Sequence, residues 1–178
     1  IILITVYMSI SVKLTSLLTE GGFGTARDSS NALALMGIGA MGSGFLFGRA
    51  EAFFKQWLLP LAFSLLALSL LGLALTHQVW LLMLMCLLSG LSFRTFIPFL
   101  LNRANQVTDG SGEQRTSLLL AGFNIGSAFA PVSVRLLQNL FQLKTVSSIY
   151  LVEAGLVFLL ALLTLIFSIM TRTKSLRS

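Results

Sequence analysis

Six long apolar segments fill most of this 178-residue chain and constrain its fold more than any other feature. A helix needs about 20 mainly apolar residues to cross roughly 30 Å of membrane hydrocarbon. The segments have that length or nearly so, and they are separated by short polar stretches. The sequence therefore predicts an all-α integral membrane protein with six transmembrane helices, at about residues 1–18, 29–47, 57–76, 79–102, 116–141 and 148–170.

The composition excludes most soluble classes of protein. Only 10% of the residues are charged and 56% are hydrophobic, whereas soluble domains carry about 25% charged residues. The net charge of +6 does not indicate nucleic acid as a partner, because the Lys and Arg residues occur singly at the ends of apolar segments. The only cysteine, Cys86, lies inside such a segment. We therefore expect the lipid bilayer as a partner, and no cofactor, metal site or catalytic centre.

The distribution of Lys and Arg predicts the orientation in the membrane, because cytoplasmic loops are enriched in these residues. The second and fourth loops and the tail at 171–178 hold seven of them. The loops on the other side hold two, Arg27 in the first loop and Lys144 in the fifth. This places the C-terminus in the cytoplasm. The seven are Arg49, Lys55, Arg103, Arg115, Arg172, Lys174 and Arg177.

The segments also repeat weakly at an interval of three. Segments 29–47 and 116–141 are rich in small residues, and segments 57–76 and 148–170 are rich in leucine. Two copies of an odd number of spans have opposite orientations, so the pattern predicts two inverted three-helix repeats. Small residues allow helices to approach closely, so we expect the two small-residue helices at the centre and the leucine-rich helices at the lipid boundary. The predicted packing residues are Gly37, Gly44, Gly48, Gly122 and Gly126.

The order of these features resembles the C-terminal half of a major facilitator superfamily transporter. The resemblance rests on a glycine-rich second helix ending at Gly48-Arg49, a leucine-rich third helix, and Asn124-x-Gly126 leading to Ala130-Pro131 in the fifth. It covers essentially the whole chain, as helices seven to twelve of twelve. It implies a missing N-terminal six-helix half, which accords with apolar sequence opening at Ile1, and the inner membrane of a bacterium. The loop at Gly48-Arg49 lacks the acidic residue typical of the family.

Arg94 is the sharpest candidate for function, because a charged side chain near the middle of a span is costly unless it faces water or a partner. The fifth segment adds a polar stripe, because Asn124, Ser127 and Arg135 recur on one helical face with Pro131. We expect this face to line an aqueous cavity. Snorkelling of Arg135 and an interhelical hydrogen bond from Asn124 are the structural alternatives. Pro98 and Pro131 free backbone carbonyls and are candidate bends or gates.

The first segment repeats this theme with Ser9 and Lys13 on one face and Tyr7 beside it. These residues are candidates for lining the same cavity, and Tyr7 has a plain packing role as its alternative. Glu153 lies in the last segment, where we expect a pair with Lys144 or Arg135 rather than a role in proton coupling. Asp28 and Ser29 are the expected N-caps of the second helix.

The resemblance implies a secondary active transporter that moves a small organic solute by alternating access, with coupling to protons. A cationic wall formed by Lys13, Arg94 and Arg135 favours anionic or polar organic solutes. A multidrug efflux carrier of the same family is the alternative substrate class. A different alternative is a stand-alone six-span protein, either a channel or an assembly subunit.

Overall fold

The computed structural model describes residues 2–105 and 112–175, and every regular element in these ranges is a helix. Six of the helices are long and apolar enough to cross a membrane, which confirms the predicted all-α architecture with six helices of spanning length. The elements are α1 (Ile2–Glu20), α2 (Ala26–Phe54), a short 3-10 turn η1 (Lys55–Trp57), α3 (Leu58–Leu75), α4 (Val79–Asn105), α5 (Gly112–Leu140) and α6 (Val146–Ser175).

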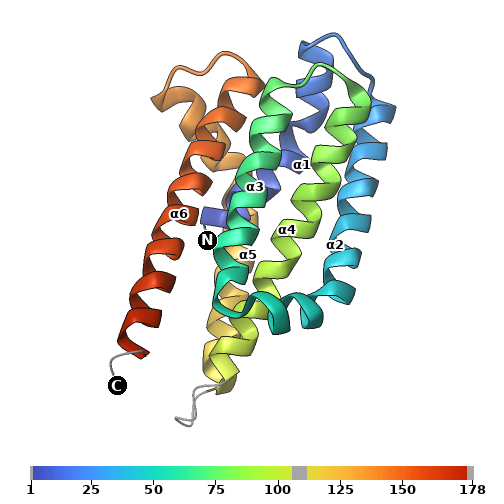
Figure 1. Ribbon diagram of the computed structural model, residues 1–178. Helices are drawn as coiled ribbons and strands as arrows, with labels where there is room; N and C mark the ends of the chain where they lie inside the picture. The colour runs from blue at the N-terminus through green and yellow to red at the C-terminus, as the bar shows by residue number, and fades with distance from the viewer. Residues whose placement is uncertain (1, 106–111, 176–178) are drawn as a thin grey trace.

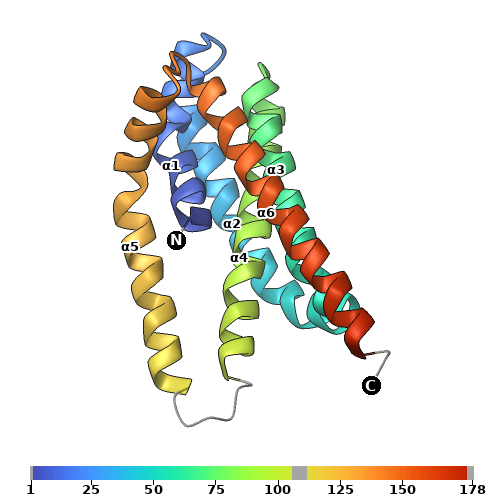
Figure 2. The ribbon, with the colours of Figure 1, turned by 90° about the vertical axis from the view of Figure 1, so that its left-hand side faces the viewer.

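Successive helices run in opposite directions (Figure 1). The turns α1–α2, α3–α4 and α5–α6 lie together at the upper end of the view, and η1 and the end of α6 lie toward the lower end. Figure 2 shows the same arrangement from the side, with α5 and α6 on different sides of the bundle. Arg27 and Lys144 therefore lie at one end, while Arg49 and Lys55 lie toward the other.

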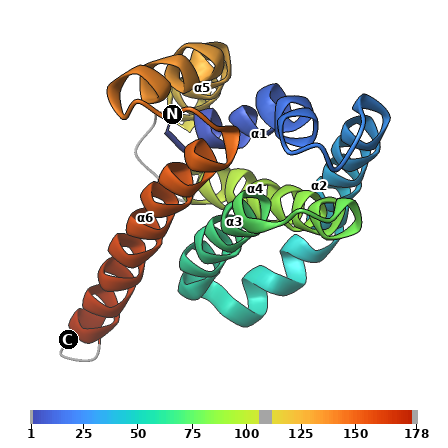
Figure 3. The ribbon, with the colours of Figure 1, turned by 90° about the horizontal axis from the view of Figure 1, so that it is seen from above.

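The most extensive helix contacts join partners that are not neighbours in sequence. α2 packs along α4, α3 packs along α6 and α4, and α1 packs along α5. The consecutive pairs α2–α3 and α5–α6 touch only slightly. Seen from above, α3 and α4 occupy the middle, and α5 lies at the edge beside α1 (Figure 3).

Two glycines set the closest of these contacts, the crossing of α2 and α4. A Cβ atom at Gly39 would collide with the backbone carbonyl of Leu87, and one at Gly90 would collide with the carbonyl of Met36. Each helix therefore presents a glycine to the backbone of the other. Helices in membranes associate through close backbone packing of this kind, because lipid is as apolar as the helix surface and no hydrophobic effect drives the helices together.

The expected lipid-boundary position of α3 and the expected central positions of α2 and α5 are wrong for the described part of the chain. α3 is the most buried helix, with 56% of its span buried, whereas the spans of α2 and α5 are 22% and 17% buried. The reason is that lipid tails are as apolar as leucine, so a leucine-rich helix suits a protein interior as well as a lipid boundary.

The start of α2 also differs from the prediction. Its N-cap is Thr25, whose Oγ1 accepts a hydrogen bond from the Asp28 backbone N at 3.4 Å. The Thr25 backbone N donates to Asp28 Oδ2 at 2.8 Å, which completes a capping box. Asp28 is thus the third helical residue, and Ser29 is buried, with its Oγ 2.8 Å from Thr15 Oγ1.

Several helices exceed their predicted lengths. α2 continues to Phe54, and α6 begins at Val146 and continues to Ser175. Most of the predicted tail at 171–178 is therefore helical, and residues 176–178 lie outside the described residues. The difference arises because hydropathy marks the apolar part of a helix, whereas hydrogen bonding carries the helix into its polar ends.

Candidate functional site

A buried carboxyl group lies at the meeting point of α1, α5 and α6. Glu153, in the second turn of α6, is only 1% exposed. An acidic side chain inside a membrane span is costly and marks a functional site by default. Glu153 is therefore the centre from which the candidate site is built.

The carboxyl group is held by α1 rather than by a cation. Ser9 Oγ lies 2.5 Å from Glu153 Oε2 and 2.7 Å from the carbonyl oxygen of Val6. The expected pair of Glu153 with Lys144 or Arg135 is wrong, because both of these cations are exposed. One turn before Glu153, the hydroxyl of Tyr150 donates to the carbonyl oxygen of Ile10 at 3.3 Å.

A second polar contact ties α1 to α5. Thr5 Oγ1 donates to the carbonyl oxygen of Gly126 at 3.0 Å. Gly126 is buried and so is Ala130, one turn later. These small residues allow α1 to lie against α5, as the sequence predicted for Gly126.

A cavity of about 470 Å³ opens between these three helices. Of the described residues that line it, Glu153 alone is charged, and Thr5 and Ser133 supply hydroxyl groups. The other lining residues are apolar, namely Ile2, Val6, Ile125, Phe129, Leu137 and Leu156. An apolar cavity with a few convergent polar groups has the composition of a small-molecule site.

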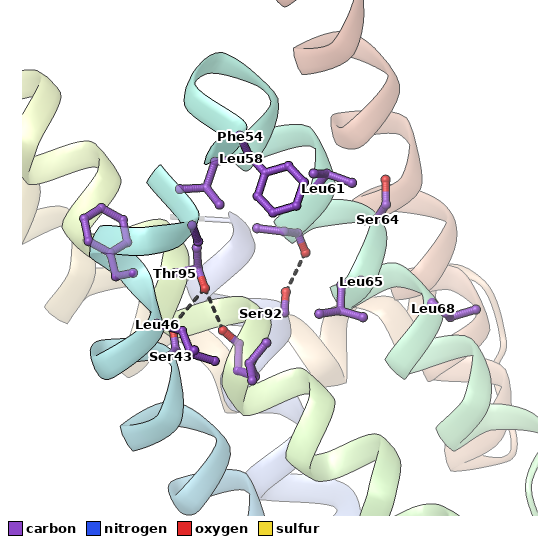
Figure 4. Close-up of a pocket in the computed structure, with 14 residues that line it drawn as sticks. Ser43, Leu46, Phe54, Leu58, Leu61, Ser64, Leu65, Leu68, Ser92 and Thr95 are labelled. Carbon is purple, nitrogen blue, oxygen red and sulfur yellow. Dashed lines mark hydrogen bonds between the residues drawn. The ribbon is translucent and has the colours of Figure 1, made fainter. Parts of the chain in front are cut away.

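A second cavity of about 470 Å³ lies between α2, α3 and α4 (Figure 4). None of the described residues that line it is charged, and its buried hydroxyl groups are engaged within the protein. Ser43 Oγ lies 2.8 Å from Thr95 Oγ1, and Ser92 Oγ donates to the carbonyl oxygen of Ala62 at 2.5 Å. This cavity offers less chemistry than the one beside Glu153.

Aromatic rings join α1 to α4 next to the predicted arginine. Tyr7 is 7% exposed, and its ring stacks on Phe93 with centroids 3.9 Å apart. Phe93 also packs beside Phe123 of α5, at 5.9 Å. Arg94 follows Phe93 directly and is exposed, although it lies well inside the span of α4. Tyr7 is thus a packing residue here, and Arg94 remains available to face water.

The other predicted cavity residues divide between two surfaces. Ser9 is buried at the α1–α6 contact, and Lys13, one turn later, is half-buried. On α5, Asn124 and Arg135 are exposed and Ser127 is half-buried, so the polar stripe lies on the outer surface of the described chain. Asn124 Nδ2 donates to the carbonyl oxygen of Leu120 in its own helix at 3.0 Å.

The predicted packing and gating residues are likewise dispersed. A Cβ atom at Gly37, Gly44 or Gly48 would meet no atom within 4 Å, and Arg49 is exposed. Gly122 and Pro98 are half-buried, and Pro131 is exposed. α4 and α5 continue as helices through their prolines.

The sequence interpretation missed a polar contact near the lower end of the bundle. Asn102 Nδ2, on α4, donates to Glu51 Oε1, on α2, at 2.7 Å. Glu51 follows Arg49 by two residues, so this contact places an acidic group near the end of α2. The only signal in the sequence is an acid and an amide near the ends of two spans, and the sequence does not show that these spans pack together.

The residues described by the structure contain no group of three or more His, Cys, Asp and Glu side chains that could hold a metal ion. Comparison of the chain with protein-family models, with curated proteins and with solved structures gives no significant match.

Proposed function

We propose that this chain is the C-terminal half of a secondary active transporter of the major facilitator type, which moves a small organic solute by alternating access. The proposal joins the sequence resemblance to one observation, the pairing of the helices. An inverted repeat of two triplets exchanges α1 with α4, α2 with α5, and α3 with α6. The pair α1–α5 then corresponds to α4–α2, and α3–α6 corresponds to itself.

These are the pairs that pack most extensively, together with α3–α4. The slight contacts also correspond, because α2–α3 exchanges with α5–α6 and both are small. The pair α3–α4 is the exception, because its counterpart α6–α1 is much less extensive. The pairing therefore supports two related triplets of opposite orientation.

The exposed faces of α2 and α5 supply a place for the expected N-terminal half. Gly37, Gly44 and Gly48 leave open space along α2, where a helix from another part of the protein can approach closely. The polar stripe of α5 and Arg94 of α4 are exposed as well. In the proposed transporter these surfaces face the second half and the water-filled path between the halves, and the C-terminus lies in the cytoplasm of a bacterial cell.

Two substrate classes have support from particular residues. The exposed guanidinium groups of Arg94 and Arg135 favour organic anions. The apolar cavity beside Glu153 favours the second candidate, export of lipophilic cations, because its single charged lining residue is acidic.

The test uses the full-length parent protein, purified and reconstituted into lipid vesicles. Radiolabelled benzoate and citrate serve as organic anions, and ethidium serves as a lipophilic cation. We expect saturable accumulation of one class that depends on an imposed pH gradient, with the loss of anion uptake in Arg94→Gln. Conductance that does not depend on a gradient would indicate a channel and would refute the carrier.

A further inference from the structure

The number of hydrogen atoms available for the contacts of Ser9 Oγ bears on the charge of Glu153. Ser9 Oγ makes two short contacts with oxygen atoms, 2.7 Å to Val6 O and 2.5 Å to Glu153 Oε2. Each contact of this length needs one hydrogen atom between the oxygens. A serine hydroxyl carries only one hydrogen, and a backbone carbonyl carries none. A protonated carboxyl group of Glu153 would supply the second hydrogen.

This count gives a continuous chain of donors and acceptors. The protonated carboxyl of Glu153 donates to Ser9 Oγ, and the Ser9 hydroxyl donates to the carbonyl oxygen of Val6. With an ionised carboxylate, the Ser9 hydroxyl donates to Glu153 and Val6 O keeps its helical N–H donor, so one hydroxyl group is left to stabilise the buried charge. A buried charge without a counter-charge is costly.

The described side chains of the helices packed around Glu153 place no counter-charge on it. α3 has no titratable residue, and the α5 residues that line the cavity with Glu153 are Ile125, Phe129, Ser133 and Leu137. On α6 itself the nearest titratable group is Tyr150, which donates to Ile10 O. Cys86, on α4, is buried.

On α1 the titratable residues near Ser9 are Tyr7, which stacks on Phe93, and Lys13, which is half-buried one turn farther along the helix. The Glu153 carboxyl group instead contacts Ser9. The neutral form of the acid is therefore the one that this closed arrangement of α1 and α6 accommodates.

The cavity gives the proton a way out. Glu153 lies in the wall of the 470 Å³ cavity but is only 1% exposed, so water in the cavity reaches its carboxyl group only when the contact between α1 and α6 opens. Transfer of its proton to water leaves a carboxylate and a hydronium ion. The carboxylate is then stabilised by hydration, and the contact with Ser9 competes with contacts to water.

We propose that Glu153 is the proton-carrying group of the transporter, neutral while α1 and α6 are joined through Ser9 and ionised when that contact opens and water from the cavity between α1, α5 and α6 reaches it. This inference rests on the proposed transport function and identifies the coupling ion and its site. Protonation is thereby linked to the contact between α1 and α6, two helices that touch only slightly elsewhere.

Infrared spectroscopy of the full-length protein in lipid vesicles tests the protonation without any need for transport. We expect a protonated-carboxyl band near neutral pH that disappears in Glu153→Gln, whose amide can still donate to Ser9. Glu153→Asp should shift the band, since its shorter side chain lengthens the contact, and this assigns the band even where Glu153→Gln folds poorly. The matched control is Glu113→Gln, an exposed acid at the start of α5, which should leave the band unchanged. A band that persists in Glu153→Gln overturns the proposal.

Transport then tests the coupling. With one proton per solute, a pH gradient of about one unit supports about tenfold accumulation, since each 1.4 kcal/mol corresponds to a factor of ten. We expect Glu153→Gln to lose this accumulation and to retain exchange of labelled for unlabelled solute. Full accumulation in Glu153→Gln, or accumulation driven by sodium at constant pH, overturns the coupling role. A Glu153 band together with gradient-independent conductance refutes the carrier, and with it the coupling, but leaves the protonated carboxyl in place.

Discussion

At the scale of single residues, two glycines determine how closely α2 and α4 can lie. Gly39 and Gly90 each stand where a Cβ atom would collide with backbone of the facing helix. A flexible side chain can move away from an added methyl group, but a backbone carbonyl held in a helix cannot. The close packing of α2 and α4 thus requires the lack of a side chain at Gly39 and Gly90.

Gly90→Ala should therefore destabilise the folded bundle. Alanine is favoured over glycine in a helix by about 1 kcal/mol, but overpacking costs about 1–3 kcal/mol, and the clash here is with the backbone of Met36. We expect a lower melting temperature of the detergent-solubilised protein, followed by tryptophan fluorescence. Gly155→Ala is the control, because a Cβ atom there meets nothing within 4 Å. Equal melting temperatures for the two variants would contradict the proposed crossing.

The sequence identifies Glu153 as an unusual acid inside a span but predicts the wrong partner for it. Hydropathy identifies Glu153 as an acid inside a span, and helical spacing identifies Ser9 as part of a polar stripe. The two residues lie 144 positions apart, and nothing local to either segment predicts their contact. The cations favoured by the sequence analysis lie at an exposed helix face and an exposed turn.

At the scale of the helices, the turn before α2 is defined by a capping box. Thr25 and Asp28 satisfy each other's backbone N–H groups, which otherwise lack partners at a helix start. The neighbouring turn contains Gly22, whose φ of +66° suits glycine. Together these residues end α1 and begin α2 within a short connection.

Thr25→Ala should remove the cap and destabilise α2 by about 1 kcal/mol. The variant leaves Asp28 without its hydroxyl donor and the Asp28 N–H without its acceptor. We expect the amides of the first turn of α2 to exchange hydrogen faster, as measured by mass spectrometry. Ser30→Ala removes a hydroxyl one turn later, where it only donates to Ala26 O, and should change little. Unaltered exchange in Thr25→Ala would show that the cap does not hold this end.

The helices themselves could be predicted from the sequence, but their neighbours could not. Length and apolarity identify a span because the hydrocarbon thickness is fixed. α3 carries apolar residues on every side, so no face distinguishes the protein interior from lipid. Its burial depends on α4 and α6, and a Cβ atom at Gly72 would collide with the side chain of Met85 of α4. The helix order in space is a property of the whole chain.

At the scale of the whole molecule, the described chain exposes two kinds of surface. α6 exposes large apolar side chains such as Leu159 and Phe167, at 58% and 69%. The span of α4 exposes the charged side chain of Arg94. A membrane protein places the first kind against lipid, whereas a charged residue inside a span faces water or a partner. The two surfaces should therefore differ in their access to water, although both are exposed in this chain.

Cysteine labelling can distinguish these surfaces in the full-length protein in vesicles. We expect Arg94→Cys to react with a membrane-impermeant cationic thiol reagent and Leu159→Cys to stay unreactive. Entry of a charge into hydrocarbon costs about 3 kcal/mol, so the rates should differ by about 100-fold. Cys86 is buried, and replacing it with alanine removes any background. If Arg94→Cys proves as inert as Leu159→Cys, the Arg94 position does not reach water, and the division into a lipid-facing and a water-facing surface fails at its central residue.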